Sequence, residues 1–333
     1  MDNWFQSDKA ERLLEATEGE MTPVRISTEH CSCLVVFMGP WWAKRAIVQG
    51  GVRILSSSSV SENLKDELRE LLMQVRSLCR RRFAVYVEMR NFADYSAFRS
   101  VFEEGGFVYC PHYDVIIPLP AVSATSDAVI LEHLFSMLHE SKQRMLRKAL
   151  ADGQTWREAQ SEEDIKAFYP ILYRLYHTKI HRPLPSCNFF IQAWRSGIKV
   201  LVTELKNQIV GGVLMPVYQL NNEQNTQSHS NNTPQTSYVA YEWYICGGIL
   251  STWAMMEWGI RHGIHYIDMM GAGEPDVPYG VRDFKLQMGG KLYEWGRFRF
   301  TIRPIAYNIG RHLFDTCKRA LMVGFPSPKW YNL

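Results

Sequence analysis

One stretch near the end of the chain constrains the fold most. It is Gly271–Gly290, with the sequence GAGEPDVPYGVRDFKLQMGG, and it lies between apolar strands predicted at Tyr266–Met270 and Leu292–Thr301. Its five glycines and two prolines predict a loop with unusual backbone angles or close backbone contacts. A loop of this length inside a compact chain is usually functional. We therefore interpret it as the active-site loop, and its ionisable residues include Asp276, Tyr279, Arg282, Asp283 and Lys285.

The same region resembles the signature of the Fem family. The matching residues are Asp268, Gly271, Gly273, Pro278–Tyr279, Phe284–Lys285 and Gly289–Gly290. The resemblance is strong over Tyr241–Pro304, weaker over Ser141–Val217 and only architectural before that. Fem proteins are transferases with paired GNAT (N-acetyltransferase-like) domains, and they move an amino acid from aminoacyl-tRNA onto a muropeptide amine. The resemblance thus implies an acyl or aminoacyl transferase of bacterial peptidoglycan or cell-envelope precursor synthesis, with a muropeptide-like or other amine acceptor.

The order of the predicted elements agrees with paired α/β domains. The chain has 333 residues, which suggests about two domains. Its first part contains, in order, two strands, a helix at Ser61–Arg80, a strand, a second helix and more strands. This order is typical of a mixed α/β sheet. Its later part contains a hairpin around Lys206–Asn207, a strand, a helix and a strand. We expect two tandem GNAT-like domains, 1–140 and 141–333, the second carrying the loop 271–290.

Bulk properties narrow the class of protein. The net charge of +3 gives no global indication of nucleic-acid binding. Residues 1–20 are polar and acidic, so a signal peptide is not expected. Seven scattered cysteines favour reduced thiols over disulfides or zinc, and no metal site is expected. A cytoplasmic protein is therefore the expectation.

The strand Tyr238–Cys246 is predicted to form the catalytic gap of the fold. In GNAT folds, two neighbouring parallel strands splay apart, and their free backbone groups bind the acyl donor. The second strand would be Tyr266–Met270. Glu242 is a charge within an otherwise apolar and aromatic strand. It is either paired with a basic side chain at a sheet edge, or a desolvated general base with a raised pKa.

Lys285 is the second predicted catalytic residue. The resemblance places it at the reaction centre, where a fixed cation would stabilise a developing oxyanion. Tyr279 is predicted to donate a proton or to line the donor pocket, and Arg282 to hold a phosphate. Phe284 and Asp268 complete the predicted substrate site, with Asp268 either orienting a neighbour or capping the loop.

A basic helix and a glycine pair are predicted to bind the larger substrates. Arg144, Arg147 and Lys148 share one helix face, which is either a solvated surface or a site for phosphates of the acceptor or of tRNA. Gly247–Gly248 stands where acetyl-CoA enzymes wrap pyrophosphate, without their basic residue. No tightly bound cofactor is expected, and the donor is either aminoacyl-tRNA or acyl-CoA. A CoA-dependent N-acetyltransferase of a small amine or amino sugar, and a non-catalytic GNAT-like binding protein, remain alternatives.

The C-terminal segment Pro304–Leu333 mixes basic and apolar residues. It is predicted either to pack as a helix on the first domain or to rest on an anionic membrane, which would place the protein at the inner face of the membrane. The oligomeric state is left open.

Overall fold

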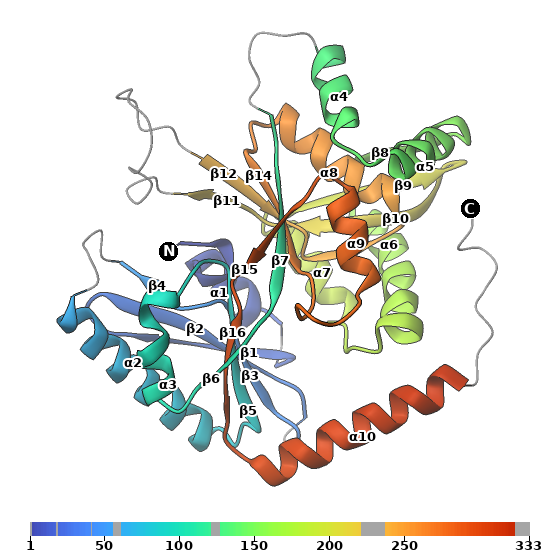
Figure 1. The fold of residues 1–333 in the computed structure, drawn as a ribbon. Coiled ribbons are helices and arrows are strands. Elements are labelled where there is room, and N and C mark those ends of the chain that lie inside the picture. The colour runs from blue at the N-terminus through green and yellow to red at the C-terminus, as the bar shows by residue number, and fades with distance from the viewer. Residues whose placement is uncertain are drawn as a thin grey trace, which may run out of the picture.

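The computed structural model describes residues 2–17, 19–40, 42–55, 61–120, 127–220 and 237–323. It is a mixed α/β structure with two halves that lie edge to edge, each built on β-sheets covered by helices (Figure 1). The expected fold class is confirmed. Each helix in the described ranges is too short or too polar to span a bilayer.

The first half is a seven-stranded sheet with the strand order β1-β2-β3-β5-β16-β6, in which β16 is Arg297–Thr301 and β4 also pairs with β2. Its helices α2 and α3 pack against the sheet, and α2 forms because Ser61 caps its first turn and its leucines recur on one buried face. Its elements are η1 (Trp4–Gln6), α1 (Asp8–Glu15), β1 (Met21–Ser27), β2 (Cys31–Met38), β3 (Arg45–Gly50), β4 (Arg53–Ile54), α2 (Glu62–Arg81), β5 (Tyr86–Asn91), η2 (Ser96–Phe98), α3 (Arg99–Glu104) and β6 (Val108–Cys110).

The second half contains a four-stranded sheet, β13-β10-β9-β8, and a five-stranded sheet, β11-β12-β14-β7-β15. The predicted hairpin is present, because Lys206 and Asn207 take the left-handed angles of its two-residue turn. The elements are β7 (Tyr113–Pro118), α4 (Asp127–Ser136), α5 (Glu140–Ala151), β8 (Gln154–Glu158), α6 (Glu162–Leu175), η3 (Tyr176–Ile180), α7 (Cys187–Arg195), β9 (Lys199–Leu205), β10 (Gln208–Met215), β11 (Val217–Leu220), β12 (Ser237–Tyr241), β13 (Tyr244–Cys246), α8 (Ile249–Arg261), β14 (Tyr266–Gly271), α9 (Gly280–Gln287) and β15 (Lys291–Glu294).

Two strands join the halves by crossing between them. The chain leaves β6 in the first-half sheet and continues as β7 between β14 and β15 of the second half. It later leaves β15 and returns as β16 (Arg297–Thr301) between β5 and β6. The crossings lie side by side, because the Gly296 N–H donates to the His112 carbonyl at 3.1 Å. The predicted boundary near residue 140 stays a prediction, and strands from both sides of it share sheets.

Three expected elements need correction. The loop 271–290 contains the helix α9, which begins after Tyr279 and ends before Gly289, where φ is +91°. The strand expected over Leu292–Thr301 is two strands in different sheets, because the chain turns at Gly296 with φ of +66°. The strand expected over Tyr238–Cys246 is likewise divided into two strands, β12 and β13, which belong to different sheets. The Asn-, Gln- and Ser-rich tract Gln219–Ser237, whose composition predicts a mobile insert in a hairpin, lies largely outside the described residues.

The C-terminal helix α10 (Pro304–Val323) starts at the end of β16 and extends beyond the sheet (Figure 1). Tyr307 attaches its first turns to the first half, because its ring lies 5.6 Å from that of Tyr86 and its hydroxyl accepts from Arg299 at 2.9 Å. The residues after 323, and the side chains after 313, lie outside the described part of the chain.

Candidate active site

The two strands predicted to splay do part. β12 and β14 run parallel through the pairs Val239 with Tyr266, Ala240 with Ile267 and Tyr241 with Asp268. The Glu242 N–H donates to the Asp268 carbonyl at 2.8 Å, and the contact ends there. β13 then turns to pair with β10, while β14 continues along β7. Glu242 therefore stands at the fork where the two strands stop pairing with each other.

Lys285 enters the same fork from α9, and it is 5% exposed. Its ammonium group donates to the carbonyl oxygens of Met269 and Gly271, the latter at 3.0 Å. Its third N–H has two further acceptors nearby, the Met270 carbonyl at 3.4 Å and Glu242 Oε1 at 3.9 Å from the nitrogen. Both distances are long for hydrogen bonds to an ammonium group. One N–H of Lys285 is thus weakly held and can serve another acceptor.

A bulge in β14 creates the carbonyl nest around Lys285. The register between β14 and β7 shifts between Asp268 and Gly271, and Met270 takes a left-handed φ of +63°. Asp268 stabilises this geometry because its carboxylate accepts from the Met270 N–H at 2.7 Å. The bulge turns successive carbonyls toward one ammonium group. Asp268 thus fixes its own strand end, and its predicted role in substrate binding stays a prediction.

Glu242 is buried as a desolvated carboxyl group with a cation beside it, so it combines features of both predicted alternatives. Its side chain is 8% exposed, and its Oε2 has no hydrogen-bond partner within the described residues. Burial raises the pKa of Glu242 to about 7, Lys285 partly opposes this rise, and Asp268 adds to it. A carboxyl group with this pKa exchanges protons near neutral pH, which suits a general base.

Two further buried carboxyl groups lie close to this pair. Burial raises the pKa of Asp268 to about 6, although its bond from Met270 and the charge of Lys285 oppose the rise. Asp114 on β7 faces Gly271 across the bulge, and burial together with the charge of Asp268 raises its pKa to about 8. The site thus holds three carboxyl groups around one lysine, and they cannot all be ionised at low cost.

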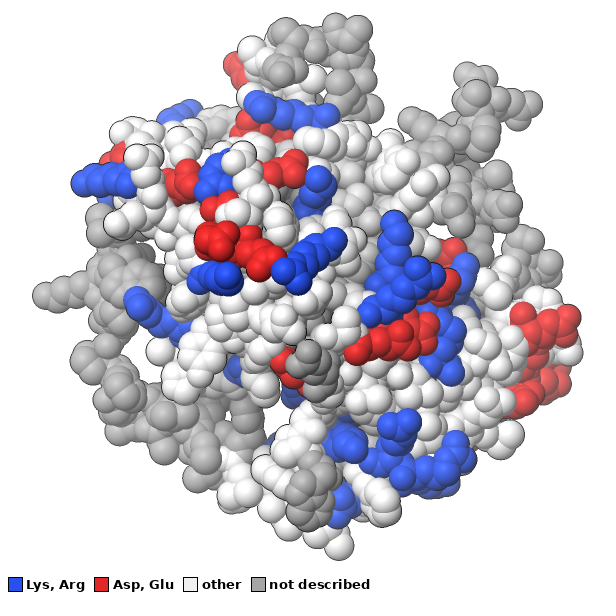
Figure 2. Space-filling view, turned by 180° about the vertical axis from the view of Figure 1, so that it is seen from behind, with Lys and Arg blue, Asp and Glu red and all other residues white. Residues whose placement is uncertain are grey.

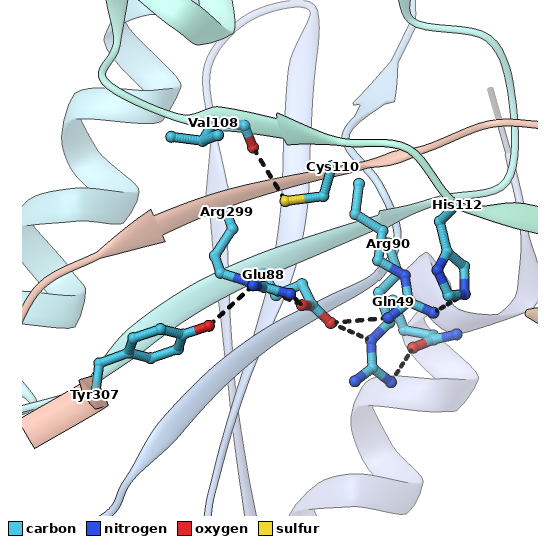
Figure 3. Close-up of polar contacts among 9 residues, drawn as sticks. Gln49, Glu88, Arg90, Val108, Cys110, His112, Arg299 and Tyr307 are labelled. Carbon is cyan, nitrogen blue, oxygen red and sulfur yellow. Dashed lines mark hydrogen bonds and ion pairs between the residues drawn. The ribbon is translucent and has the colours of Figure 1, made fainter. Parts of the chain in front are cut away.

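A cluster of arginines borders the site from the first half (Figure 3). Glu88 accepts from Arg90 at 2.9 Å, from Arg297 at 3.3 Å and from Arg299 at 2.7 Å. Burial opposes ionisation of Glu88, but Arg90 and Arg297 outweigh it and lower its pKa to about 2. The single carboxylate of Glu88 faces three guanidinium groups, so the cluster keeps a net positive charge.

His112 connects this cluster to the lysine nest. Arg297 donates to His112 Nε2 at 2.6 Å, so this nitrogen is the acceptor and the ring is neutral. Burial and the charge of Arg297 lower the pKa of His112 to about 3. A Cβ atom on Gly271 would lie 3.0 Å from His112 Nε2 and 3.1 Å from Arg297 Nη2. The absence of a side chain at Gly271 therefore lets the nest pack against the arginine cluster.

The other residues predicted in the loop have separate places. Tyr279 precedes α9, is 40% exposed and covers Gly273 with its ring. Arg282 donates to the carbonyls of Glu274 at 2.7 Å and Val277 at 2.6 Å, so it holds the loop before α9. Phe284 is half-buried under Lys142 of the basic helix. The phosphate-binding role of Arg282 stays a prediction.

The basic helix and the glycine pair lie on neighbouring elements of the second half. Arg144, Arg147 and Lys148 are exposed on α5, and within the described residues no hydrogen bond or ion pair joins them to the fork. Gly247 packs so closely on β10 that an added Cβ would lie 2.6 Å from the Gly211 Cα. Gly248, with φ of +72°, faces open space before α8. Only Gly248 thus leaves room for a ligand at this helix start.

Several residues of the site carried no signal in the sequence. Asp114, His112 and Arg297 belong to the crossing segments, so no local spacing brings them near Lys285. Tyr176 begins the π-helix η3, where burial raises its pKa to about 12, and Glu242 contributes to that rise. Such π-turns occur often at functional sites, but their sequence looks like ordinary helix.

Comparison with known proteins reveals the fold. No family model matches the sequence, and no curated protein matches it. The structure is similar to FemX, with a TM-score of 0.60 and 12% identity over 92% of this chain and 94% of that one. It is also similar to L-PGS from Bacillus licheniformis, with a TM-score of 0.53 and 12% identity over 89% and 91% of the two chains.

A third similar structure is the C-terminal domain of a putative lysylphosphatidylglycerol synthetase from Agrobacterium fabrum. Its TM-score is 0.51, with 11% identity over 91% of this chain and 90% of that one. The chain therefore has a fold like that of FemX, as its signature residues predicted.

Proposed function

We propose that this protein is an acyl or aminoacyl transferase that forms an amide on an amine acceptor. The observation that carries the proposal is the buried pair of Glu242 and Lys285, 3.9 Å apart at the fork of β12 and β14. A buried carboxyl group with a pKa near 7 beside a fixed ammonium group has no evident structural use, since well-packed apolar residues would be as stable.

The reaction assigns one task to each residue. Glu242, in its ionised form, takes the proton from the acceptor amine as the nitrogen attacks the acyl carbon of an ester or thioester. The weakly held N–H of Lys285 then donates to the oxyanion that forms on the acyl oxygen. Collapse of this intermediate expels the alcohol or thiol of the donor, which receives the proton. Burial makes both interactions stronger than they would be in water.

Similarity to FemX and to L-PGS supports a donor of the aminoacyl type and an acceptor in cell-envelope synthesis. We propose aminoacyl-tRNA as the donor and a muropeptide-like amine as the acceptor. The open backbone at Gly248 favours one second candidate, a CoA-dependent N-acetyltransferase, because the start of α8 could hold a pyrophosphate.

Thermal shift with charged tRNA, acetyl-CoA and a muropeptide nucleotide, followed by product detection, tests the proposal. Lys285→Met should lower kcat by about 10²- to 10³-fold, because it removes the oxyanion partner. The double variant Lys285→Met with Glu242→Gln should be equally inactive while leaving no buried charge unpaired. Lys291→Met on β15 is the control and should keep full activity.

The outcomes separate the candidates. If only acetyl-CoA raises the melting temperature and an acetylated product forms, the donor is acetyl-CoA rather than aminoacyl-tRNA. Full activity of Lys285→Met would refute the assigned mechanism. If none of the three ligands raises the melting temperature, the proposal of a non-catalytic binding protein replaces that of an enzyme.

A further inference from the structure

One end of the first-half sheet gathers three segments that are far apart in sequence. They are the turn between β2 and β3, the end of α2 and the start of α10. The Val85 N–H donates to the Lys44 carbonyl at 2.7 Å, and the Val85 carbonyl accepts from the N–H groups of Ile302 at 2.9 Å and Arg303 at 3.0 Å. These contacts fix the three segments beside one another, and we call this surface the basic end.

The basic end has cations without neighbouring acids. Residues 36–49, 71–87 and 300–313 contain no Asp or Glu. Arg80, Arg81, Arg82 and Arg303 are exposed, and within the described part of the chain none of them forms an ion pair. In Figure 2, Lys and Arg side chains gather at the lower end of the molecule, where Figure 1 places the end of α2, and the acidic side chains lie higher.

Large apolar side chains are exposed at the same end. Phe83 is 69% exposed immediately after the three arginines, and Trp42 is 61% exposed in the β2–β3 turn. On α10, Ile305, Ile309 and Leu313 follow at intervals of four residues, so they form one stripe, and all three are more than half exposed.

The stripe on α10 faces away from the protein. Tyr307, which attaches the helix to Tyr86 and Arg299, lies about 160° around the helix from Ile309, at 100° per residue. The side that packs on the sheet is therefore opposite to the apolar stripe. Aliphatic side chains held away from the core in this way gain nothing from the fold itself.

We propose that the basic end docks on the surface of an anionic lipid bilayer. Anionic headgroups match a surface that has cations and lacks acids, and the interfacial region just below them accepts aromatic and aliphatic side chains. RNA would match the arginines but leave the stripe of Ile305, Ile309 and Leu313 in water. The combination thus favours a bilayer over a nucleic acid. This inference is independent of the proposed chemistry, because the basic end shares no residue with the candidate active site.

Cosedimentation of the full chain with vesicles tests this proposal. Phosphatidylcholine vesicles with phosphatidylglycerol should bind the protein at low salt, and vesicles of phosphatidylcholine alone should bind it much less. Replacing Arg80, Arg81 and Arg82 by Gln should lower the partition coefficient by about a hundredfold, at roughly fivefold per charge. Phe83→Asn with Ile309→Gln should lower it by about tenfold or more, through lost apolar burial.

A matched control replaces Lys9, Lys166 and Lys206, which are exposed on other surfaces, by Gln. It removes the same charge and should change vesicle binding only slightly. Absence of binding to phosphatidylglycerol vesicles would overturn the proposal. The proposal would also be overturned if the three arginines bound tRNA, if Phe83→Asn with Ile309→Gln left that binding unchanged, and if the protein did not bind vesicles. Since the readout is binding, neither result depends on whether the protein is a transferase.

Discussion

At the scale of single residues, burial of Glu242 has a consequence for stability as well as for catalysis. Its pKa is about 7 in the folded protein and near 4.5 when the carboxyl group is free in water. Between these two values the unfolded chain is ionised while the folded protein keeps the proton. The folded state therefore loses stability as the pH rises from 4.5 to 7, and the whole cost is present above pH 7.

Glu242→Gln should remove this dependence. Relative to the original protein, the variant should gain about 3 kcal/mol in its free energy of unfolding between pH 4.5 and pH 8. Urea denaturation at a series of pH values measures the gain. Asp268 and Asp114 also have raised pKa values, but they are present in both proteins, so they enter the difference only through their coupling to Glu242. A constant difference across this range would show that Glu242 is ionised at no cost.

Residue patterns explain which parts of the site were predictable. Glu242 stood out because a lone charge in an aromatic strand needs a partner, and Lys285 was marked by the motif around it. Asp114 and Arg297 could not be found in this way, because their positions depend on strands that cross between the halves. The nest of carbonyls was also hidden, since it depends on a left-handed Met270 rather than on a glycine.

At the scale of elements, α9 is held against β7 at one point of very close contact. A Cβ atom on Gly290 would lie 2.2 Å from Val115 Cγ1 and 2.8 Å from the Lys285 carbonyl oxygen. Val115 is fully buried, and the carbonyl is backbone, so neither can move away easily. The glycine pair after the helix thus sets the distance at which Lys285 enters the fork.

Gly290→Ala should therefore displace α9 and destabilise the protein by about 1–3 kcal/mol, through overpacking. It should also lower the proposed activity more than its effect on stability would predict, since Lys285 moves with the helix. Gly280→Ala is the matched control, because a Cβ there meets no atom within 4 Å. Thermal unfolding and kcat of both variants check this, and equal behaviour would contradict the role given to Gly290.

Elements whose apolar residues recur at regular helix or strand spacing were predicted well, and those without such a pattern were missed. The helix α2 and the hairpin of β9 and β10 lie where the sequence placed them, within a residue or two. The first helix and strand, α1 and β1, were not predicted. In α1 only Ala10, Leu13 and Leu14 are buried, and the apolar surface that holds it comes from distant segments.

At the scale of the whole molecule, the crossing strands make the two halves depend on each other. β16 fills the gap between β5 and β6, and its Phe298 is 1% exposed and stacks on Phe102 with ring centroids 4.0 Å apart. The N-terminal segment adds a second connection, since Phe5 packs on Tyr241 and Trp243 of the second half. We therefore expect the halves to unfold together.

Phe298→Ala should lower the free energy of unfolding by about 3–5 kcal/mol, as expected for a fully buried aromatic ring. Urea unfolding followed by tryptophan fluorescence should still show one transition, moved to lower urea. Phe83→Asn, at an exposed aromatic position of the same half, should change stability by less than about 0.5 kcal/mol. Two separate transitions in Phe298→Ala would show that the halves are thermodynamically independent.

The position of β16 also affects how the protein is made. Domains usually fold in order as they leave the ribosome. Here the first-half sheet stays split between β5 and β6 until residues 297–301 have been synthesised, about 190 residues after the end of β6 at Cys110. While residues 111–296 are synthesised, the nascent chain therefore presents two unpaired strand edges, and such edges invite aggregation. We therefore expect the nascent protein to depend on chaperones until β16, which is distant in sequence from β5 and β6, closes the first-half sheet.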